Sequence, residues 1–374
     1  MTIVIVGAGL AGLRTAEALR DKGFNGSLTL VGEETHLPYD RPPLSKQVLR
    51  GDREPMLLRA EEEYADLDLD LRLGLRVTGL DPVARQVVTD EGRLDYDHVV
   101  IATGAEPRRL PGAPGVVLRT LDDCRALAPY LREGATLGIV GAGLIGCEVA
   151  ASARAKGADV HLVDVLTAPL VRVLGDTVSQ RVRALHEQHG VHLHLGTGVA
   201  EATSTRLTLT DGTVLDVDVV LEALGARPST DWLGGSVPLD DGVVCDQVGH
   251  AADGVWAVGD VARWGGRRLE HWTSAAEQAN VVAAAILGDR TPWHVAPYWW
   301  SDQYDVKLQG VGLPSAEDDV QVLEVGPRSR PLALYSRDGV LTGAVGFSAA
   351  AFVMKLRDAV RDGGSLADAV AAVT

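Results

Sequence analysis

The chain has 374 residues and a formal net charge of −16, and 46% of its residues are hydrophobic. This length predicts two or three domains with their own cores, and the ordinary apolar content excludes a disordered or fibrous chain. A chain this acidic does not suit nucleic acid or an anionic membrane as its main partner.

In residues 1 to about 110, short apolar runs predict strands at 2–6, 27–31, 75–80, 86–89 and 99–104. An alanine-rich helix at 10–22 joins the first two strands, which gives a β-α-β unit. A proline-rich loop at 37–46 follows this unit.

Residues from about 112 to 230 repeat this plan. Strands are expected at 137–140, 159–163 and 219–225, with helices at 144–156 and 176–189. Asp211-Gly212 predicts a hairpin turn between two further strands. Four histidines that pass from the second helix into the next strand are expected on a solvated surface: His186, His189, His192 and His194.

The last part of the chain begins with a buried strand at 255–260 and a helix at 274–287. Pro292 and Pro297 then mark a linker. Strands at 306–311, 321–325, 332–336 and 340–345, followed by two helical pieces, predict a small α+β domain.

The three cysteines, Cys124, Cys147 and Cys245, form neither a Cys-x-x-Cys pair nor a metal-ligand spacing. We therefore expect buried thiols in a reducing cytoplasm and no bound metal. The first predicted strand leaves no room for a signal peptide, and no apolar run reaches the roughly 18 residues of a membrane span.

The same glycine signature occurs twice, each time after a β-branched strand and before a helix. It is Gly-Ala-Gly-Leu-Ala-Gly at 7–12 and Gly-Ala-Gly-Leu-Ile-Gly at 141–146. Such a turn lets a dinucleotide pyrophosphate approach the backbone N–H groups at a helix N-terminus. Two complete signatures predict two dinucleotide sites on two Rossmann-like α/β domains, with the small α+β domain at the C-terminus.

An acidic residue follows each signature by about 20 positions, Glu33 after the first and Asp164 after the second. This is the place of the carboxylate that binds the adenosine ribose. No arginine stands beside Asp164, which favours NADH over NADPH, although Arg172 lies within reach of that region.

Several single residues have both a structural and a functional interpretation. Asp260 follows a buried strand and is either a turn residue or a ligand of a flavin ribityl hydroxyl. Trp272 begins a helix whose N-terminus would stabilise an anionic reduced flavin. Lys46 and Glu148 could be surface charges, but Glu148 lies one turn into the second Rossmann helix, where such folds face a nicotinamide. Trp299-Trp300 are either core residues, or one of them lies over the flavin or at an electron exit.

The chain resembles the FAD- and NAD-dependent ferredoxin reductases that serve cytochrome P450s and Rieske oxygenases, of the putidaredoxin reductase and biphenyl dioxygenase ferredoxin reductase type. The resemblance spans essentially the whole length. It rests on Pro-Tyr-Asp-Arg-Pro-Pro-Leu-Ser-Lys at 38–46, Ala-Thr-Gly at 102–104, Gly-Ala-Gly-Leu-Ile-Gly-Cys-Glu at 141–148, Val-Gly-Asp-Val-Ala at 258–262, Glu-His-Trp at 270–272 and Trp-Ser-Asp-Gln-Tyr at 300–304.

The resemblance implies a glutathione-reductase-like fold. Its expected domains are an FAD-binding domain at 1–111 and 232–290, an NAD-binding domain at 112–231 and a C-terminal α+β domain at 291–374. It implies an NADH-dependent flavoprotein that passes electrons singly to a small [2Fe–2S] ferredoxin, as a monomer or weak dimer.

The resemblance also implies the site residues. Those expected at FAD are Gly7, Ala8, Gly9, Gly12, Glu33, Arg41, Lys46, Val77, Thr103, Arg119, Asp260 and Trp272. Those expected at NADH are Gly141, Gly143, Leu144, Ile145, Gly146, Glu148, Asp164, Arg172 and Gly225. Lys46 and Glu148 resemble the charged pair beside the flavin N5, and Trp300 the aromatic residue near the flavin ring.

Three alternatives stay open at this stage: a rubredoxin reductase, an NADH oxidase, and a redox-sensing interaction protein like apoptosis-inducing factor. Disulfide reductases on this scaffold carry a redox cysteine where this chain has Arg-Pro-Pro-Leu-Ser-Lys at 41–46. Ser-Ala-Ala-Ala-Phe at 348–352 departs from the family pattern, and the C-terminal domain is shorter than usual. Both departures concern the electron acceptor rather than the flavin.

Overall fold

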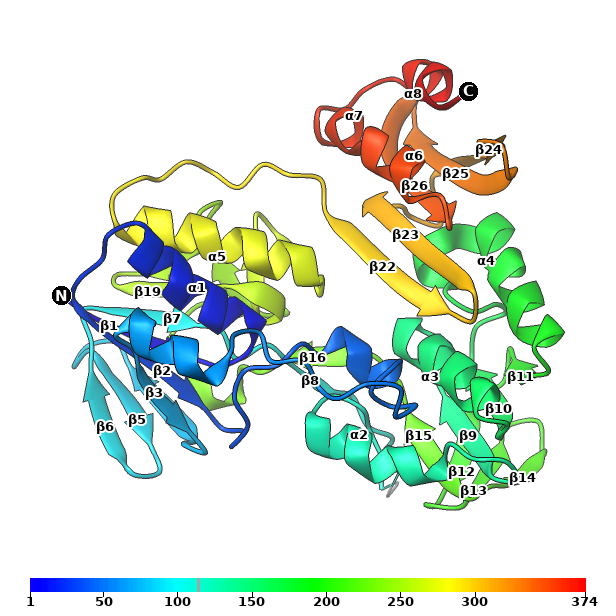
Figure 1. Ribbon diagram of the computed structural model, residues 1–374, viewed down its shortest axis with the longest axis horizontal. Coiled ribbons are helices and arrows are strands. Elements are labelled where there is room, and N and C mark those ends of the chain that lie inside the picture. The colour runs from blue at the N-terminus through cyan, green and yellow to red at the C-terminus, as the bar shows by residue number, and fades with distance from the viewer. Residues whose placement is uncertain (113–114) are drawn as a thin grey trace. The chain divides into compact units, whose positions relative to one another are not determined.

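The computed structural model describes residues 1–112 and 115–374, which divide into two compact units (Figure 1). Unit 1 comprises Met1–Asp40, Met56–Glu106 and Ala226–His294. Unit 2 comprises Arg41–Pro55, Pro107–Gly225 and Val295–Thr374. Each unit is therefore assembled from segments that lie far apart in the sequence.

Unit 1 is built on a six-stranded sheet with the strand order β18-β19-β7-β1-β2-β3. The central strand β1 pairs in parallel with both β2 and β7, and β19 pairs in parallel with β7. The carboxyl ends of these strands therefore meet at one edge. The strands are β1 (Thr2–Val6), β2 (Ser27–Gly32), β3 (Asp70–Leu73), β7 (His98–Ile101), β18 (His250–Ala252) and β19 (Val255–Ala257).

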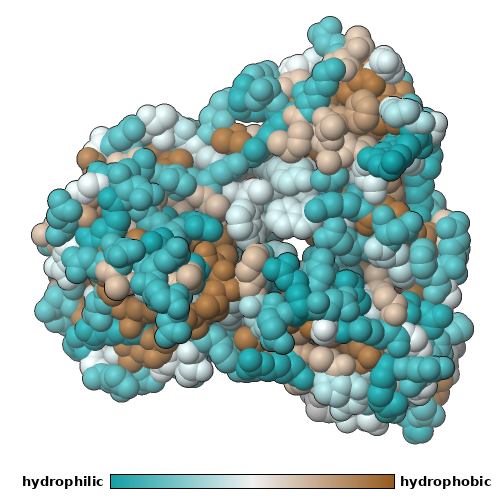
Figure 2. Space-filling view, viewed as in Figure 1, coloured by the Kyte–Doolittle hydropathy of each residue, from teal (hydrophilic) through white to brown (hydrophobic). Residues whose placement is uncertain are grey.

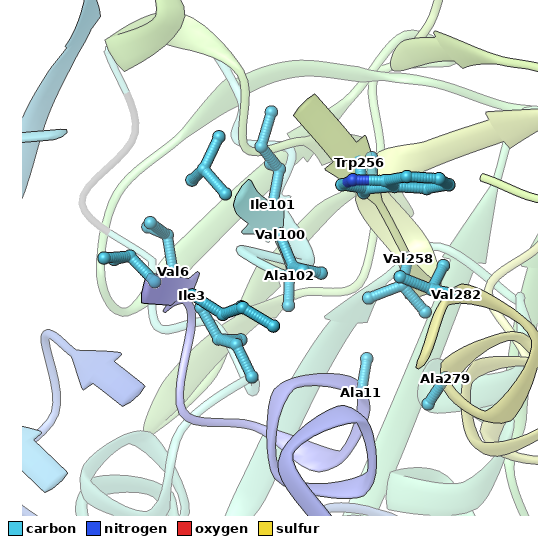
Figure 3. Close-up of a cluster of buried hydrophobic side chains, with 14 of the residues drawn as sticks. Ile3, Val6, Ala11, Val100, Ile101, Ala102, Trp256, Val258, Ala279 and Val282 are labelled. Atoms are coloured by element: carbon cyan, nitrogen blue, oxygen red, sulfur yellow. The ribbon is translucent and has the colours of Figure 1, made fainter. Parts of the chain in front are cut away.

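Helices α1 (Leu10–Asp21) and α5 (Trp272–Ile286) lie side by side against this sheet (Figure 1). Figure 3 shows Ala11 of α1 and Ala279 of α5 facing the buried side chains of the strands, which include Ile101 and Trp256. The buried faces of both helices are rich in alanine, so their axes can approach each other closely.

Smaller sheets accompany the main one. An antiparallel sheet of β4–β6 adds Leu80 and Val87 to the same core. The remaining elements are β4 (Val77–Asp81), β5 (Gln86–Thr89), β6 (Gly92–Asp95), β8 (Ala105–Pro107), β16 (Ala226–Pro228), β17 (Val243–Cys245), β20 (Ala262–Trp264), β21 (Arg267–Arg268), η2 (Glu61–Leu67), η4 (Asp231–Leu233) and η5 (Gly259–Val261).

Unit 2 contains a second parallel sheet with the order β11-β10-β9-β15, and an antiparallel sheet of β12–β14 beside it. The strands are β9 (Thr136–Val140), β10 (Asp159–Asp164), β11 (His192–Leu195), β12 (Val199–Ala202), β13 (Arg206–Leu209), β14 (Val214–Asp216) and β15 (Val219–Glu222). The predicted turn at Asp211-Gly212 joins β13 to β14 and is confirmed.

The helical elements of unit 2 outside its C-terminal part are α2 (Leu121–Leu127), α3 (Leu144–Ala155), α4 (Val171–Gln188), η1 (Pro42–Ser45) and η3 (Ala128–Tyr130). Helix α4 starts five residues before the predicted 176, because a first helical turn continues across Gly175, whose φ of 67° interrupts regular geometry. The prediction placed the start after this interruption.

The C-terminal part of unit 2 is a five-stranded antiparallel sheet of order β22-β23-β26-β25-β24. Its elements are β22 (Tyr298–Gln303), β23 (Val306–Gly312), β24 (Asp319–Val325), β25 (Arg330–Arg337), β26 (Val340–Phe347), α6 (Ala350–Lys355), α7 (Arg357–Arg361) and α8 (Leu366–Val373). Strand β22 was not predicted, because its aromatic run was interpreted as a cluster without assigned structure. Trp299 is buried, so core packing is confirmed for one of the paired tryptophans.

The three cysteines are buried free thiols, as predicted. Burial raises the pKa of the Cys124 thiol to about 11 and that of Cys245 to about 12. The expectation of a solvated surface is wrong for His186, which is 0% exposed because the end of α4 packs against residues that follow β22. His192 is exposed.

The molecular face drawn in Figure 2 is mostly hydrophilic, as the net charge of −16 leads one to expect. Among the described residues, none of the helices combines the length and the apolar character needed to cross a bilayer. In the same residues, no group of three or more histidine, cysteine or acidic side chains is arranged to hold a metal ion.

Candidate functional site

The first glycine signature forms a tight turn between β1 and α1 in unit 1. Gly7 has a φ of 113°, and a Cβ atom there would lie 2.2 Å from the carbonyl oxygen of Ala102. A Cβ atom on Gly12 would lie 2.0 Å from the carbonyl oxygen of Gly7. The fold itself therefore requires glycine at these two positions.

The second signature repeats this geometry in unit 2, between β9 and α3. Gly141 has a φ of 107°, and its Cβ atom would lie 2.3 Å from the carbonyl oxygen of Ala223. A Cβ atom on Gly146 would lie 1.9 Å from the carbonyl oxygen of Gly141. The two turns are equivalent to within a few degrees and tenths of an ångström.

The middle glycines, Gly9 and Gly143, differ from the others. A Cβ atom on either one would meet nothing within 4 Å. Both residues stand at the N-cap of their helix with ordinary extended φ values of −90° and −78°. Neither packing nor backbone conformation requires glycine here, which fits a ligand that approaches the helix N-terminus.

The two acidic residues differ in their surroundings. Asp164 at the end of β10 accepts hydrogen bonds from the backbone N–H groups of Ala142 (2.7 Å) and Leu166 (2.8 Å). This carboxylate is therefore fixed against the second glycine turn. Glu33 is exposed and pairs with Arg76, with 3.4 Å between Nε and Oε1. It retains freedom to reorient toward a ligand.

Two of the other residues expected at FAD within unit 1, Thr103 and Asp260, follow parallel strands at the carboxyl edge of the main sheet. Thr103 follows β7, and its hydroxyl donates to the carbonyl of Ser229 at 2.9 Å. Asp260 lies in η5 after β19, and Val77 begins β4. The indole N–H of Trp272 donates to Asp40 at 2.8 Å, which anchors the start of α5.

The N-terminus of α5 carries two buried polar atoms that sequence reasoning did not single out. The Nδ1 atom of His271 and the hydroxyl oxygen of Ser274 have no hydrogen-bond partner among the described residues. Burial lowers the pKa of His271 to about 4, so its ring is neutral at pH 7. Buried polar atoms are rarely left without a partner, so this helix end fits a polar ligand.

Lys46 and Glu148 form a buried ion pair in unit 2, with 2.7 Å between Nζ and Oε2. Their side chains are 6% and 4% exposed. The hydroxyl of Ser45 donates to the same carboxylate, and that of Ser301 donates to Oε1 at 2.7 Å. The interpretation of these residues as surface charges is therefore wrong, because η1, which Lys46 directly follows, packs onto α3.

The remaining predicted residues of unit 2 are more open. Arg41 donates to the carbonyl of Arg119 at 2.8 Å, which brings these two predicted FAD ligands together. Ile145, Arg172 and Gly225 are exposed, and Leu144 is half-buried. Trp300 is half-buried beside Tyr298 and Lys307, whose ammonium lies 5.9 Å from the centre of its indole ring.

Comparison with known proteins agrees with this geometry. Residues 1–279 match the family model described as pyridine nucleotide-disulphide oxidoreductase, and residues 298–373 match that of the reductase C-terminal domain. The chain belongs to the pyridine nucleotide-disulphide oxidoreductase family. Membership confirms the predicted fold, the oxidoreductase activity, and the use of FAD with a nicotinamide dinucleotide.

Three relatives refine this position within the family. Rhodocoxin reductase of Rhodococcus erythropolis is 38% identical over 339 residues, which cover 85% of this chain and 79% of that protein. The ferredoxin reductase component of chlorobenzene dioxygenase from a Cupriavidus strain is 42% identical over 329 residues, which cover 83% and 80%. The predicted resemblance to the ferredoxin reductases of oxygenase systems is therefore confirmed.

The third relative is a solved structure, the covalent complex of putidaredoxin reductase with putidaredoxin. It is 31% identical to this chain and superposes with a TM-score of 0.92. The similarity covers 100% of this chain and 98% of that one. The C-terminal sheet that follows residue 298 is thus part of a known reductase architecture.

Proposed function

We propose that the protein oxidises NADH and, with FAD bound, passes the electrons one at a time to a small [2Fe–2S] ferredoxin that serves a cytochrome P450 or a Rieske oxygenase. The observation that carries the proposal is the pair of equivalent glycine turns whose middle glycines face open space. FAD, when bound, supplies the chemistry that couples a two-electron donor to a one-electron acceptor.

The first turn suits the dinucleotide that stays bound. Gly7, Gly9 and Gly12 would hold the FAD pyrophosphate and Glu33 its ribose. The Nδ1 atom of His271 and the hydroxyl of Ser274 lack a hydrogen-bond partner in the described part of the chain, and they add polar atoms at the start of α5, where the flavin ring is expected. This helix N-terminus would stabilise negative charge on the pyrimidine edge of the ring.

The second turn suits the dinucleotide that is exchanged. Gly141, Gly143 and Gly146 would hold the NADH pyrophosphate, and Asp164 would accept hydrogen bonds from the ribose hydroxyls. Because the backbone of Ala142 and Leu166 holds Asp164 in place, its negative charge would repel the 2′-phosphate of NADPH. Exposed Ile145 and Gly225 leave this side open for rapid exchange.

Lys46 and Glu148 would form the charged pair beside the flavin N5. Hydrogen bonds from Ser45 and Ser301 hold the carboxylate, and the ammonium donates to the carbonyl of Pro42 at 3.1 Å. A rigid pair of opposite charges orients the reacting rings without adding net charge. Positioning of this kind is the main contribution that the protein makes to a cofactor reaction.

Thiol chemistry finds no support near this pair. Residues 41–55 contain no cysteine. Cys124 donates to the carbonyl of Leu44 at 3.3 Å, and burial raises its pKa to about 11. Cys147, the neighbour of Glu148 in α3, is fully buried, and burial likewise raises the pKa of its thiol. A thiol held in this state is a poor nucleophile at neutral pH. The free, buried cysteines also suit the reducing cytoplasm proposed for the protein.

The proposed acceptor rests on the relatives, which include ferredoxin reductase components and a reductase crystallised with putidaredoxin. The test is cytochrome c reduction by NADH with and without added [2Fe–2S] ferredoxins. We expect strong stimulation by at least one ferredoxin. Rapid oxygen consumption without stimulation would instead identify an NADH oxidase, and stimulation by rubredoxin alone would identify a rubredoxin reductase.

A further inference from the structure

A chain of buried hydrogen bonds leads away from Glu148 through unit 2. Ser301 contacts Glu148 at 2.7 Å, and the side-chain amide of Gln303 contacts Ser301 at 3.2 Å. The ring of His186 contacts Gln303 at 3.2 Å through Nε2 and the hydroxyl of Tyr304 at 2.8 Å through Nδ1. Ser301, Gln303 and His186 are all 0% exposed.

The carboxylate determines the direction of every bond in this chain. An ionised carboxylate only accepts, so Ser301 must donate its proton to Glu148. The oxygen of Ser301 must then accept from the Gln303 amide nitrogen, which leaves the amide oxygen to accept from His186. His186 therefore carries its proton on Nε2, and its Nδ1 accepts from Tyr304.

The surroundings of His186 agree with this assignment. Burial lowers its pKa to about 4, so the ring is neutral at pH 7 and has one donor and one acceptor. All four donors then point toward Glu148. Aligned hydrogen bonds polarise one another, which strengthens the last bond onto the carboxylate.

The outer end of the chain borders a cavity of about 630 Å³, and so does the partner of Glu148, Lys46. Its lining residues are Lys46, Gln47, Arg50, Ala151, Arg154, Ala155, His189, Asp302 and Tyr304.

Tyr304 has a φ of 57°, a conformation that residues other than glycine rarely adopt. The ring of His189 stacks on Tyr304, with 3.6 Å between ring centres, and helps to hold it there.

We propose that Ser301, Gln303, His186 and Tyr304 are positioning residues that hold the Glu148 carboxylate turned toward Lys46. The proposal rests on the proposed function, in which this pair lies beside the flavin. If the chain is broken, the carboxylate loses the donor that fixes its Oε1 atom and can turn away from Lys46. The positive charge of Lys46 is then no longer balanced where reduced flavin would form.

Variants along the chain test the proposal on the FAD-loaded enzyme. We expect Ser301→Ala to slow flavin reduction by NADH roughly tenfold, the effect of one hydrogen bond to a charged group. The slowing of flavin reduction should be smaller in Gln303→Leu and roughly twofold in Tyr304→Phe, since these residues lie progressively further from Glu148 along the hydrogen-bond chain. The flavin midpoint potential should rise in the same order.

Tyr335→Phe is the matched control. Tyr335 lies in the same five-stranded sheet as Ser301, and its buried hydroxyl donates at 2.8 Å to the carbonyl of Leu174 in α4. It is not part of the hydrogen-bond chain that leads to Glu148. We expect no change of flavin potential in this variant. Equal shifts in Tyr304→Phe and Tyr335→Phe would overturn the proposal, because they would indicate a general effect on packing.

Two further measurements separate positioning from fold support. In a Glu148→Gln background, Tyr304→Phe should have no further effect on flavin potential, and an undiminished effect would overturn the proposal. Nitrogen-15 NMR of the histidine rings should find the proton of His186 on Nε2, and a proton on Nδ1 would contradict the chain. If NADH fails to reduce the wild-type flavin, the proposed function fails. The NMR measurement still tests the position of the proton on His186, because it does not depend on flavin reduction.

Discussion

Replacing Gly143 by alanine separates what the fold requires from what a bound dinucleotide requires. The new methyl group would meet no atom within 4 Å, and the φ of −78° suits alanine. Alanine lowers the entropy of the unfolded chain but is a poorer N-cap than glycine, and these opposing effects are each about 1 kcal/mol or less. We therefore expect the free energy of unfolding to change by less than about 1 kcal/mol.

NADH binding should respond very differently. The methyl group would occupy the space where the pyrophosphate approaches the backbone, and a lost hydrogen bond to a charged group costs about 1.5–3 kcal/mol. The dissociation constant, measured by calorimetry on the FAD-loaded protein, should rise roughly 10- to 100-fold.

Gly146→Ala is the control for this prediction. Its methyl group would lie 1.9 Å from the carbonyl oxygen of Gly141, so the backbone must move. Overpacking of this kind costs about 1–3 kcal/mol, and urea unfolding should show that loss. Wild-type NADH affinity in Gly143→Ala, or a loss of stability equal to that of Gly146→Ala, would refute the reasoning.

Further predictions concern three other buried or fixed groups. Lys46→Met should lower the free energy of unfolding by about 3–5 kcal/mol, because it leaves the Glu148 carboxylate buried without its cation. The double variant Lys46→Met/Glu148→Gln should lose less than the sum of the single losses in urea titrations, and simple additivity would contradict the pair. Asp164→Asn should raise the catalytic efficiency with NADPH relative to NADH by roughly tenfold, since the repulsion of the 2′-phosphate is removed; an unchanged ratio in steady-state assays would argue against this role. Burial lowers the pKa of His186 in the folded state to about 4, so between pH 6.5 and 4 the unfolded state binds more protons and stability falls as the pH is lowered. Between pH 6.5 and 5 this loss should reach roughly 2 kcal/mol in wild type and be absent in His186→Gln, as urea titrations at both pH values would show.

Much of the fold could be predicted from local patterns. The strands at Thr2–Val6 and Gln86–Thr89 have the predicted bounds, because apolar periodicity and turn residues mark them clearly. Strand β22 was missed, since its buried face combines Trp299 with polar residues, and its other face is half-buried rather than solvated. Its buried Ser301 and Gln303 give no hydrophobic signal.

The candidate site was predictable only in part for a similar reason. The glycine turns depend on contacts within a few residues and one neighbouring strand, so a short motif identifies them. The environment of Glu148 depends on Lys46 and Ser301, which are far away in the sequence. His186 looked like a surface residue because its partners, Gln303 and Tyr304, lie more than a hundred positions later.

The most direct test of the account is to mix the FAD-loaded protein with NADH in the absence of oxygen and follow the flavin absorbance. The account predicts that the flavin band bleaches rapidly with NADH, much more slowly with NADPH, and returns when an oxidised [2Fe–2S] ferredoxin is added. A flavin band that NADH leaves unchanged, or a reduced flavin that no ferredoxin reoxidises, would contradict it.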